Sequence, residues 1–273
     1  MAVRQWPQAD YEEVTCCRCG ISGQLLFTQR RFGIVQCPQC HLVFTSPRLK
    51  KEAIRNIYEA SSYFDEGVYG FSKQINLGML LQRAWTRGRL DLIRGLVKGD
   101  PHTKKMLEIG CAYGLFLQAA RHQGFEVAGV EYSNTAVQWS AEHLGLPVQQ
   151  GELKDAQLPS QRFDVICFWD VLEHVDNPVA FLKLVHQYLV PGGIVVFSTP
   201  YVNSLPARLL HSRWWTLRPE QHLWHFTPHT LGLLFADAGM HLEQVIADPL
   251  APANIGRLDS LVGVVRVVAC HAG

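Results

Sequence analysis

The sequence predicts an α/β protein: a doubly wound, mostly parallel sheet with helices on both faces, preceded by a small cysteine-bearing lobe. Two observations carry this prediction. From residue 105 onward, apolar runs of strand length alternate with helix-like stretches, which is the pattern of βα units. Before residue 50, two cysteine pairs stand among short β-like runs without that alternation. A chain of 273 residues has room for one α/β domain and a small appendage.

The first hundred residues divide into two regions. Short strands are expected at 25–29, 32–36 and 42–45. Ser46-Pro47 ends that pattern, a short helix is expected at 50–59, and the stretch 61–71 is predicted as a loop. Ser72 is a suitable N-cap for a helix that reaches about residue 98. The predicted regions of the whole chain are a cysteine lobe over 1–50, a helical connector or lid over 51–100, and the main domain over 101–273.

The main domain supplies the strands and helices of the predicted sheet. Strands are expected at 105–109, 126–130, 148–150, 165–168, 194–198, 242–247 and 262–269. Helices are expected at 115–123, 135–144, 178–189 and 228–238. Gly124, Gly145 and Gly239 end three of these helices, and Pro178 suits the first turn of another. Strands and helices that alternate in this way form a parallel sheet covered on both faces.

The composition indicates which binding partners and which cellular compartment to expect. The formal net charge is +1, so no overall field attracts nucleic acid or a membrane surface. The N-terminus lacks the apolar core of a signal peptide, and the apolar stretch 261–270 is too short to span a bilayer. We therefore expect a cytoplasmic protein. In that reducing compartment, eight cysteines indicate metal binding rather than a disulfide framework.

Four cysteines have the spacing of a zinc ribbon. Cys16 and Cys19 form one Cys-x-x-Cys pair, Cys37 and Cys40 form another, and seventeen residues separate the pairs. Each short turn presents two sulfurs to one side of a tetrahedral ion, and four thiolates leave no open position for catalysis. Redox chemistry, the alternative, needs only one pair and a thioredoxin-like context. We predict structural Zn²⁺, with Cys17 pointing away or standing in for Cys16.

The most informative segment joins the first strand of the main domain to the helix after it. Gly110 and Gly114 allow the backbone to bend sharply and to approach a ligand, which the N–H groups at the helix start then face. The dinucleotide fingerprint G-x-G-x-x-G does not fit, because Ala112 and Leu115 occupy its second and third glycine positions. The dinucleotide interpretation therefore fails at two of its three glycine positions.

This turn resembles motif I of class I S-adenosylmethionine (SAM)-dependent methyltransferases, E/D-x-G-x-G-x-G, with Ala112 replacing the middle glycine. The resemblance continues in order through the main domain, at 130–133, 151–153, 168–175 and 189–193. It implies a Rossmann-like class I sheet and SAM as cofactor. It also implies a set of cofactor-binding residues: Glu108, Gly110, Cys111, Ala112, Tyr113, Gly114, Glu131, Tyr132, Glu152, Leu153 and Asp170. In such enzymes an acid at the position of Glu131 binds the ribose hydroxyls, and the segment after the third strand contacts adenine.

The cysteine lobe sharpens this resemblance. Cysteine pairs followed by Phe44-Thr45-Ser46-Pro47 and an aromatic connector look like bacterial methyltransferases that act on small molecules or glycans. The segment 221–226 is similar to the E-H-L-S-Y-F segment of deoxysugar C-methyltransferases, which have a comparable zinc lobe. Gln221 stands where they have glutamate, and the chain ends before their additional C-terminal domain. C-methylation of a nucleotide sugar is therefore an alternative rather than the main prediction.

Three histidines are candidates for the general base. In a doubly wound sheet the ligand lies beyond the carboxyl ends of the strands, where His174, His222 and His225 are expected. A histidine takes up a proton near neutral pH, and His222 is the first choice because of the C-methyltransferase resemblance. The segment from Asp170 to His174 also resembles an E-x-x-E-H cluster of quinone-biosynthesis O-methyltransferases that is linked to magnesium. Binding of a divalent ion and a structural role for Glu173 and His174 both stay open.

The predicted function is SAM-dependent methylation, with O-methylation of a small-molecule or glycan acceptor as the main hypothesis. The protein aligns the acceptor with the activated methyl group and excludes water. RNA methylation is a second alternative, which the near-zero net charge argues against. A non-catalytic SAM-binding assembly module is a third. The intact set of Glu108, Gly110, Gly114 and Glu131 argues against that one.

Overall fold

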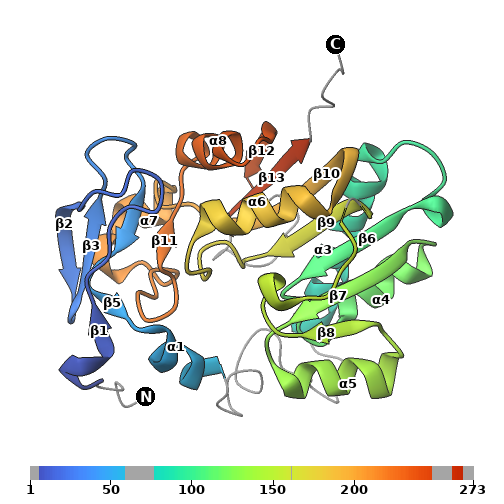
Figure 1. Ribbon diagram of the computed structural model, residues 1–273, viewed down its shortest axis with the longest axis horizontal. Coiled ribbons are helices and arrows are strands. Elements are labelled where there is room, and N and C mark those ends of the chain that lie inside the picture. The colour runs from blue at the N-terminus through green and yellow to red at the C-terminus, as the bar shows by residue number, and fades with distance from the viewer. Residues whose placement is uncertain (1–5, 59–76, 161, 248–259, 267–273) are drawn as a thin grey trace.

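The computed structural model describes residues 6–58, 77–160, 162–247 and 260–266, which form two adjoining lobes (Figure 1). Seven strands of the larger lobe form one sheet, in the order β12-β13-β10-β9-β6-β7-β8. Their bounds are β6 Lys105–Ile109, β7 Glu126–Glu131, β8 Val148–Gln150, β9 Phe163–Trp169, β10 Leu189–Pro200, β12 His241–Ala247 and β13 Ser260–Arg266. Strands β6 to β10 are parallel, and β13 is antiparallel to both of its neighbours. The doubly wound, mostly parallel sheet predicted from the sequence is confirmed.

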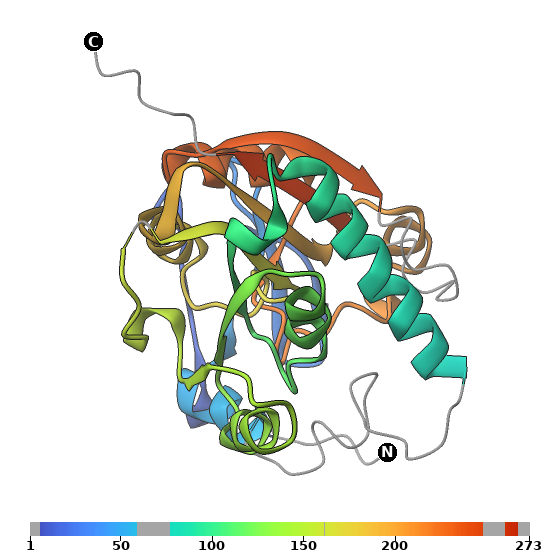
Figure 2. The ribbon, with the colours of Figure 1, turned by 90° about the vertical axis from the view of Figure 1, so that its right-hand side faces the viewer.

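Helices cover both faces of this sheet (Figures 1 and 2). They are α3 Leu77–Leu96, α4 Leu115–His122, α5 Asn134–Leu144, α6 Pro178–Tyr188 and α8 Pro228–Asp237, with 3-10 turns η2 Pro101–Thr103 and η3 Leu153–Asp155. Successive side chains of a strand point to opposite faces, so Val165 packs in the same cluster as α3 and α4, and Ile166 in the same cluster as α6 and α8. This double burial is the reason that the strands are apolar without alternation.

Side-chain caps set the helix starts close to the predicted positions. Ser133 Oγ accepts the Ala136 N–H at 3.3 Å, and Asn177 Oδ1 accepts the Ala180 N–H at 3.0 Å. Thr227 and Thr230 form a reciprocal capping box at the start of α8. The predicted loop 61–71, the start of the helix at Ser72 and the end of the last strand beyond residue 266 lie outside the described residues. Within the described ranges, no helix is long and apolar enough to cross a membrane.

The smaller lobe is built on the N-terminal strands. A four-stranded sheet has the order β11-β4-β3-β2, and β1 pairs with β5. Its elements are η1 Gln8–Asp10, β1 Tyr11–Glu12, β2 Gln24–Gln29, β3 Phe32–Gln36, β4 Val43–Thr45 and β5 Arg48–Leu49, followed by α1 Lys51–Tyr58. The fourth strand, β11 Trp224–His225, comes from the long connection between β10 and α8, which also contains α7 Leu205–Leu210 and η4 His211–Arg213.

This shared strand joins the two lobes into one structural unit. Trp224 and His225 pair with Phe44 and Val43 in antiparallel register. The main hydrophobic cluster runs without interruption from Phe44 to Phe168 in the centre of the large sheet. The cysteine lobe predicted over residues 1–50 therefore lacks a strand that its sheet contains. The long connection between β10 and α8 thus completes the sheet of the cysteine lobe.

Candidate functional site

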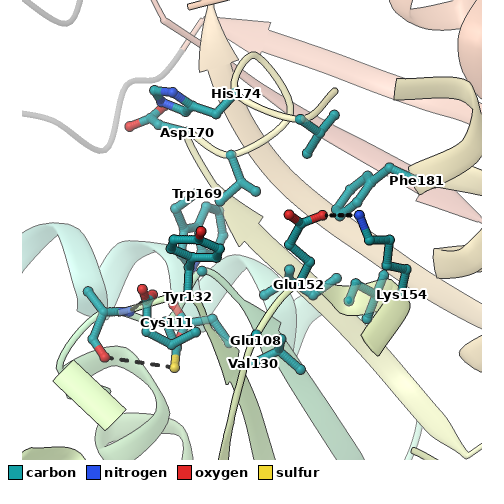
Figure 3. Close-up of a pocket in the computed structure, with 18 of the residues that line it drawn as sticks. Glu108, Cys111, Val130, Tyr132, Glu152, Lys154, Trp169, Asp170, His174 and Phe181 are labelled. Atoms are coloured by element: carbon teal, nitrogen blue, oxygen red, sulfur yellow. Dashed lines mark hydrogen bonds and ion pairs between the residues drawn. The ribbon is translucent and has the colours of Figure 1, made fainter. Parts of the chain in front are cut away.

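A cavity of about 470 Å³ opens at the carboxyl ends of β6, β7 and β9 (Figure 3). Ten of the eleven residues predicted to bind the cofactor line it, and Gly114 is the exception because it is buried as the N-cap of α4. Figure 3 shows His174 and Asp170 at one end of the cavity and Glu152, Lys154 and Phe181 at the other. Residues of α1, α3 and α6 complete the walls.

The glycine turn forms the floor of the cavity in a left-handed conformation. Gly110, Ala112 and Gly114 have φ values of 70°, 47° and 76°. A Cβ at Gly110 would lie 2.6 Å from Val171 Cγ2, and one at Gly114 would lie 2.5 Å from Leu146 Cδ1. Both glycines are therefore required by space as well as by backbone conformation, whereas the position between them accommodates the methyl group of Ala112.

Glu131 connects this turn to the end of β7. It is buried, its Oε2 accepts the Ala112 N–H at 2.8 Å, and its Oε1 accepts the Ser133 N–H at 2.8 Å. Burial raises the pKa of Glu131, and these two N–H groups act in the opposite direction. Each oxygen keeps a second lone pair, so the carboxylate can accept hydrogen bonds from a ligand diol in the cavity.

Arg89 of α3 is a cavity residue that was not predicted. Its guanidinium lies over the rings of Trp85 and Trp169, with Cζ 3.1 and 3.8 Å from the ring centroids. Its Nη2 donates to Ser198 Oγ at 3.1 Å, and Ser198 Oγ donates to Asp170 Oδ1 at 2.9 Å. The spacing of the residues could have identified Arg89. Trp85, Arg89 and Ile93 follow one another at intervals of four residues and therefore share one face of the helix.

Glu108 places a carboxyl group close to Arg89. Its side chain is almost completely buried under the turn, and burial raises its pKa well above the usual range, while the Arg89 guanidinium lowers it. A buried carboxyl group and a buried guanidinium at one end of a cavity match a ligand that carries both an ammonium and a carboxylate group.

The other end of the cavity is bounded by Glu152 and Leu153, directly after β8. Glu152 Oε1 accepts from Lys51 Nζ at 2.5 Å, and its Oε2 accepts from Lys154 Nζ at 2.7 Å. Burial raises the pKa of Glu152, but the two lysines lower it more, so its pKa lies below the usual value. Leu153 is buried and offers an apolar surface. Lys51 comes from α1 and was not predicted to reach this site.

Among the described residues that line the cavity, His174 is the one histidine. Its Nδ1 lies 3.1 Å from the carbonyl oxygen of Gln221, which assigns the Nδ1–H as donor and leaves Nε2 with a lone pair. Burial lowers the pKa of His174 to about 4, although Gln221 and the charge of Asp170 act in the other direction. The side chain is 20% exposed, so the ring stays accessible from the cavity.

The other two candidate histidines lie behind the cavity wall. The His222 ring meets the His174 ring edge to face, with centroids 4.6 Å apart, and its own side chain is buried. His225 lies on β11 and contacts Thr45 Oγ1 through Nε2 at 3.4 Å. Burial lowers the pKa of both rings, that of His225 to about 4. The structure therefore does not place the first choice, His222, or His225 in the lining of the cavity.

Hydrogen bonds hold the segment that carries these histidines against the site. The Glu173 carbonyl accepts the N–H groups of Leu223 and Trp224 at 2.8 and 3.3 Å, and Trp224 Nε1 donates to the Val175 carbonyl at 2.8 Å. On the other side, the Thr45 N–H donates to the Leu223 carbonyl at 2.9 Å. The cysteine lobe thus supports the wall that contains His174.

The possible divalent-ion group differs from the predicted one. Ligand atoms of Glu173, His174 and His222 lie within 4.8 Å of one another, and Asp170 is not part of this group among the described residues. Asp170 instead accepts from Ser198 Oγ, and Glu173 Oε2 accepts from Thr199 Oγ1 at 3.0 Å. Two imidazoles and one carboxylate suit zinc or iron better than magnesium, which prefers oxygen ligands.

The four predicted cysteines meet in the small lobe. The sulfurs of Cys16, Cys19, Cys37 and Cys40 lie within 4.8 Å of one another, and Cys17 is outside this group in the portion of the chain that the structure describes. The two turns are alike: Gly20 N donates to the Cys16 carbonyl, and His41 N to the Cys37 carbonyl. Sulfurs about 2.3 Å from a central ion are about 3.8 Å apart in a tetrahedron, so this cluster fits Zn²⁺.

Comparison with known proteins identifies the family. A family described as "Methyltransferase domain" matches residues 80–245, which run from α3 to β12 and include the whole glycine turn. The chain belongs to this methyltransferase family. The matched residues include the predicted cofactor segments and His174, so the cavity lies in the methyltransferase domain itself.

The curated relatives of the chain are also methyltransferases by name. The ubiquinone biosynthesis O-methyltransferase of Azoarcus sp. (strain BH72) is 38% identical over 103 residues, which cover 35% of this chain and 44% of that protein. The mitochondrial protein of the same name from Schizosaccharomyces pombe is 34% identical over 133 residues, 46% of each chain. The chain thus spans less than half the length of these two relatives.

Solved structures show the same fold at low identity. The 1,6-didemethyltoxoflavin-N1-methyltransferase of Burkholderia thailandensis, solved with S-adenosylhomocysteine bound, has a TM-score of 0.59 at 16% identity and covers 90% of this chain and 99% of its own. A SAM-dependent methyltransferase from Mesorhizobium loti has a TM-score of 0.53 at 20% identity and covers 68% and 99%. The methyltransferase domain therefore has the class I, Rossmann-like fold that the motifs implied.

Proposed function

We propose that this chain is a SAM-dependent methyltransferase that transfers a methyl group to a hydroxyl oxygen of a small-molecule acceptor. One observation carries the proposal: a single cavity joins the glycine turn, Glu131, Arg89 and His174. The names of the relatives, ubiquinone biosynthesis O-methyltransferases, support oxygen as the methylated atom. A reducing, cytoplasmic location fits the cysteine cluster. Methylation of a glycan hydroxyl would use the same reaction.

The cofactor is proposed to lie along the cavity from Arg89 to Glu152. Arg89 and Glu108 match the carboxylate and ammonium groups of its amino-acid end, because a guanidinium and a carboxyl group line the same end of the cavity. Glu131 accepts hydrogen bonds from the ribose hydroxyls with the lone pairs that Ala112 and Ser133 leave. Leu153 and the segment around it cover the adenine. SAM supplies an activated methyl group, so the protein has to align and shield it.

His174 is the proposed general base, in place of His222. Its Nδ1–H is held by the Gln221 carbonyl, so Nε2 is the nitrogen that takes the acceptor proton. The imidazolium that forms is stabilised by Glu173, whose Oε1 lies 4.0 Å from Nε2, and by the charge of Asp170. His222 packs edge to face against this ring and is proposed to orient it.

The three regions of the chain are proposed to have separate tasks. Residues 1–50, with zinc bound by four cysteines, are proposed to support the cavity wall beside His174. Residues 51–100 are proposed to form a lid, and residues 101–273 to bind the cofactor. Zinc at this cluster supplies folding energy to a lobe with little core of its own.

Incubation with isotopically labelled SAM and a panel of phenols, sugars, amines and RNA tests the proposal. The expected result is a labelled methyl group bonded to a phenolic or alcoholic oxygen, with loss of the hydroxyl proton and formation of S-adenosylhomocysteine. Transfer to carbon, nitrogen or RNA alone would replace the proposed acceptor class, and failure to bind SAM would remove the enzymatic proposal.

A further inference from the structure

We propose that Lys51 is a positioning residue for the cofactor, because it fastens α1 across the adenine end of the cavity by bridging two carboxylates. This inference rests on the proposed function, and it assigns a role in cofactor binding to the N-terminal region of the chain. The Lys51 ammonium lies 2.5 Å from Glu152 Oε1 and 3.3 Å from Asp176 Oδ2.

The two carboxylates come from different segments that line the cavity. Glu152 follows β8, and Asp176 lies in the connection between β9 and α6. Both residues line the cavity, as do Lys51 and Ile54 of α1. One cation thus connects three separate segments around the same opening, and Ile54 presents its buried side chain from the next turn of the helix.

The small lobe also holds the N-terminal end of α1. Lys50 N donates to the Asp10 carbonyl at 2.7 Å, directly after β5 pairs with β1. Ala53 and Ile54 are buried in the main hydrophobic cluster. Figure 1 places α1 between the two lobes, so its N-terminal turn is held by the small lobe on one side and by the Lys51 bridges on the other.

The order of ligand groups along the cavity identifies which end Lys51 closes. Glu131 at the end of β7 is the proposed ribose contact, and the proposed amino-acid end lies toward Glu108 of β6 and Arg89 of α3. The adenine must then extend toward β8, where Glu152 and Leu153 follow the strand. Lys154 Nζ lies 2.7 Å from the second oxygen of Glu152, so removal of Lys51 frees one side of the carboxylate and removes the link from α1 to the adenine end of the cavity.

The experiment compares Lys51→Met with Lys50→Met. Methionine keeps most of the apolar stem and removes the charge, and Lys50 is an exposed lysine one position earlier that serves as the matched control. Binding of S-adenosylhomocysteine and of 5′-methylthioadenosine, which lacks the amino-acid end, is measured by calorimetry. Lys51→Met should weaken both by roughly three- to tenfold, the range for two partly exposed ion pairs, and Lys50→Met should weaken neither.

Two further readouts separate positioning from general loosening. The ratio of the two affinities should stay at the wild-type value in Lys51→Met, because the amino-acid end is untouched. Added salt should weaken binding to the wild-type protein more than to Lys51→Met. Asp176→Asn, which weakens one of the two bridges by removing the charge of the carboxylate partner, should give a smaller loss and provides the test if Lys51→Met does not fold.

The outcomes distinguish this proposal from the proposed function. Unchanged affinity of folded Lys51→Met for both ligands, with tight binding by the wild-type protein, would overturn the role of Lys51 alone. A changed ratio of affinities would also overturn it. Failure of the wild-type protein to bind either ligand would overturn the proposed function, and the role of Lys51 with it.

Discussion

Replacement of Glu131 by alanine tests the proposed ribose contact directly. Each Glu131 oxygen accepts one backbone N–H bond of 2.8 Å and keeps one lone pair for a ligand. Hydrogen bonds to a charged group contribute about 1.5–3 kcal/mol, so SAM affinity should fall by a factor of roughly 10–150. The same change leaves the Ala112 and Ser133 N–H groups without their acceptor. The free energy of unfolding should therefore also fall, by about 1–3 kcal/mol.

Calorimetry with S-adenosylhomocysteine measures the first effect, and urea unfolding measures the second. Glu126→Ala is the matched control, because Glu126 lies at the opposite end of the same strand, where it pairs at the surface with Arg162 and Lys105. That variant should bind the ligand like the wild-type protein. Unchanged affinity in a folded Glu131→Ala protein would refute the assignment of Glu131 to the ribose.

Three further predictions concern the metal, the base and the buried histidines. Purified protein should contain about one zinc per chain, and Cys37→Ser should lose the metal and loosen the first sixty residues; elemental analysis that finds no metal in the wild-type protein would contradict this. His174→Ala should lower kcat by about 10²–10⁴ with SAM affinity nearly unchanged, while a turnover within a few fold of wild type would return the role to His222. Because the base has a pKa of about 4, kcat/KM should fall only as the pH drops toward that value. Burial favours the neutral form of His225, so its pKa is about 4 in the folded protein and about 6.5 in the unfolded chain. The contribution of neutral His225 to stability is therefore present above pH 6.5 and is lost as the pH falls toward 4. Between pH 7 and pH 5 this loss should be about 2 kcal/mol. Urea unfolding at the two pH values should show a smaller loss for His225→Gln, and equal losses would contradict the buried-histidine explanation.

Local patterns in the sequence determined most of the sheet and the floor of the cavity. Strands β6 and β8 were predicted over their full length, because runs of apolar residues act over short distances. The described ends of the other strands and helices of the main domain lie close to the predicted ones, except that β10 already begins at Leu189 rather than at residue 194. The glycine turn was identifiable for the same reason: its conformation and its place between a strand and a helix are local. The four cysteines were grouped correctly, since each pair is a single turn.

The tertiary structure decided which distant side chains meet. The pairing of β11 with β4 joins residues about 180 positions apart, and no local pattern in a two-residue strand indicates its partner. That pairing buries His225, turns His222 behind the wall and leaves His174 facing the cavity. Arg89 and Lys51 reach the site from helices whose residues, taken alone, suit an exposed basic face. Whether a basic side chain on such a helix faces solvent or a cavity depends on what packs against the helix, and that information lies in the other segments of the chain.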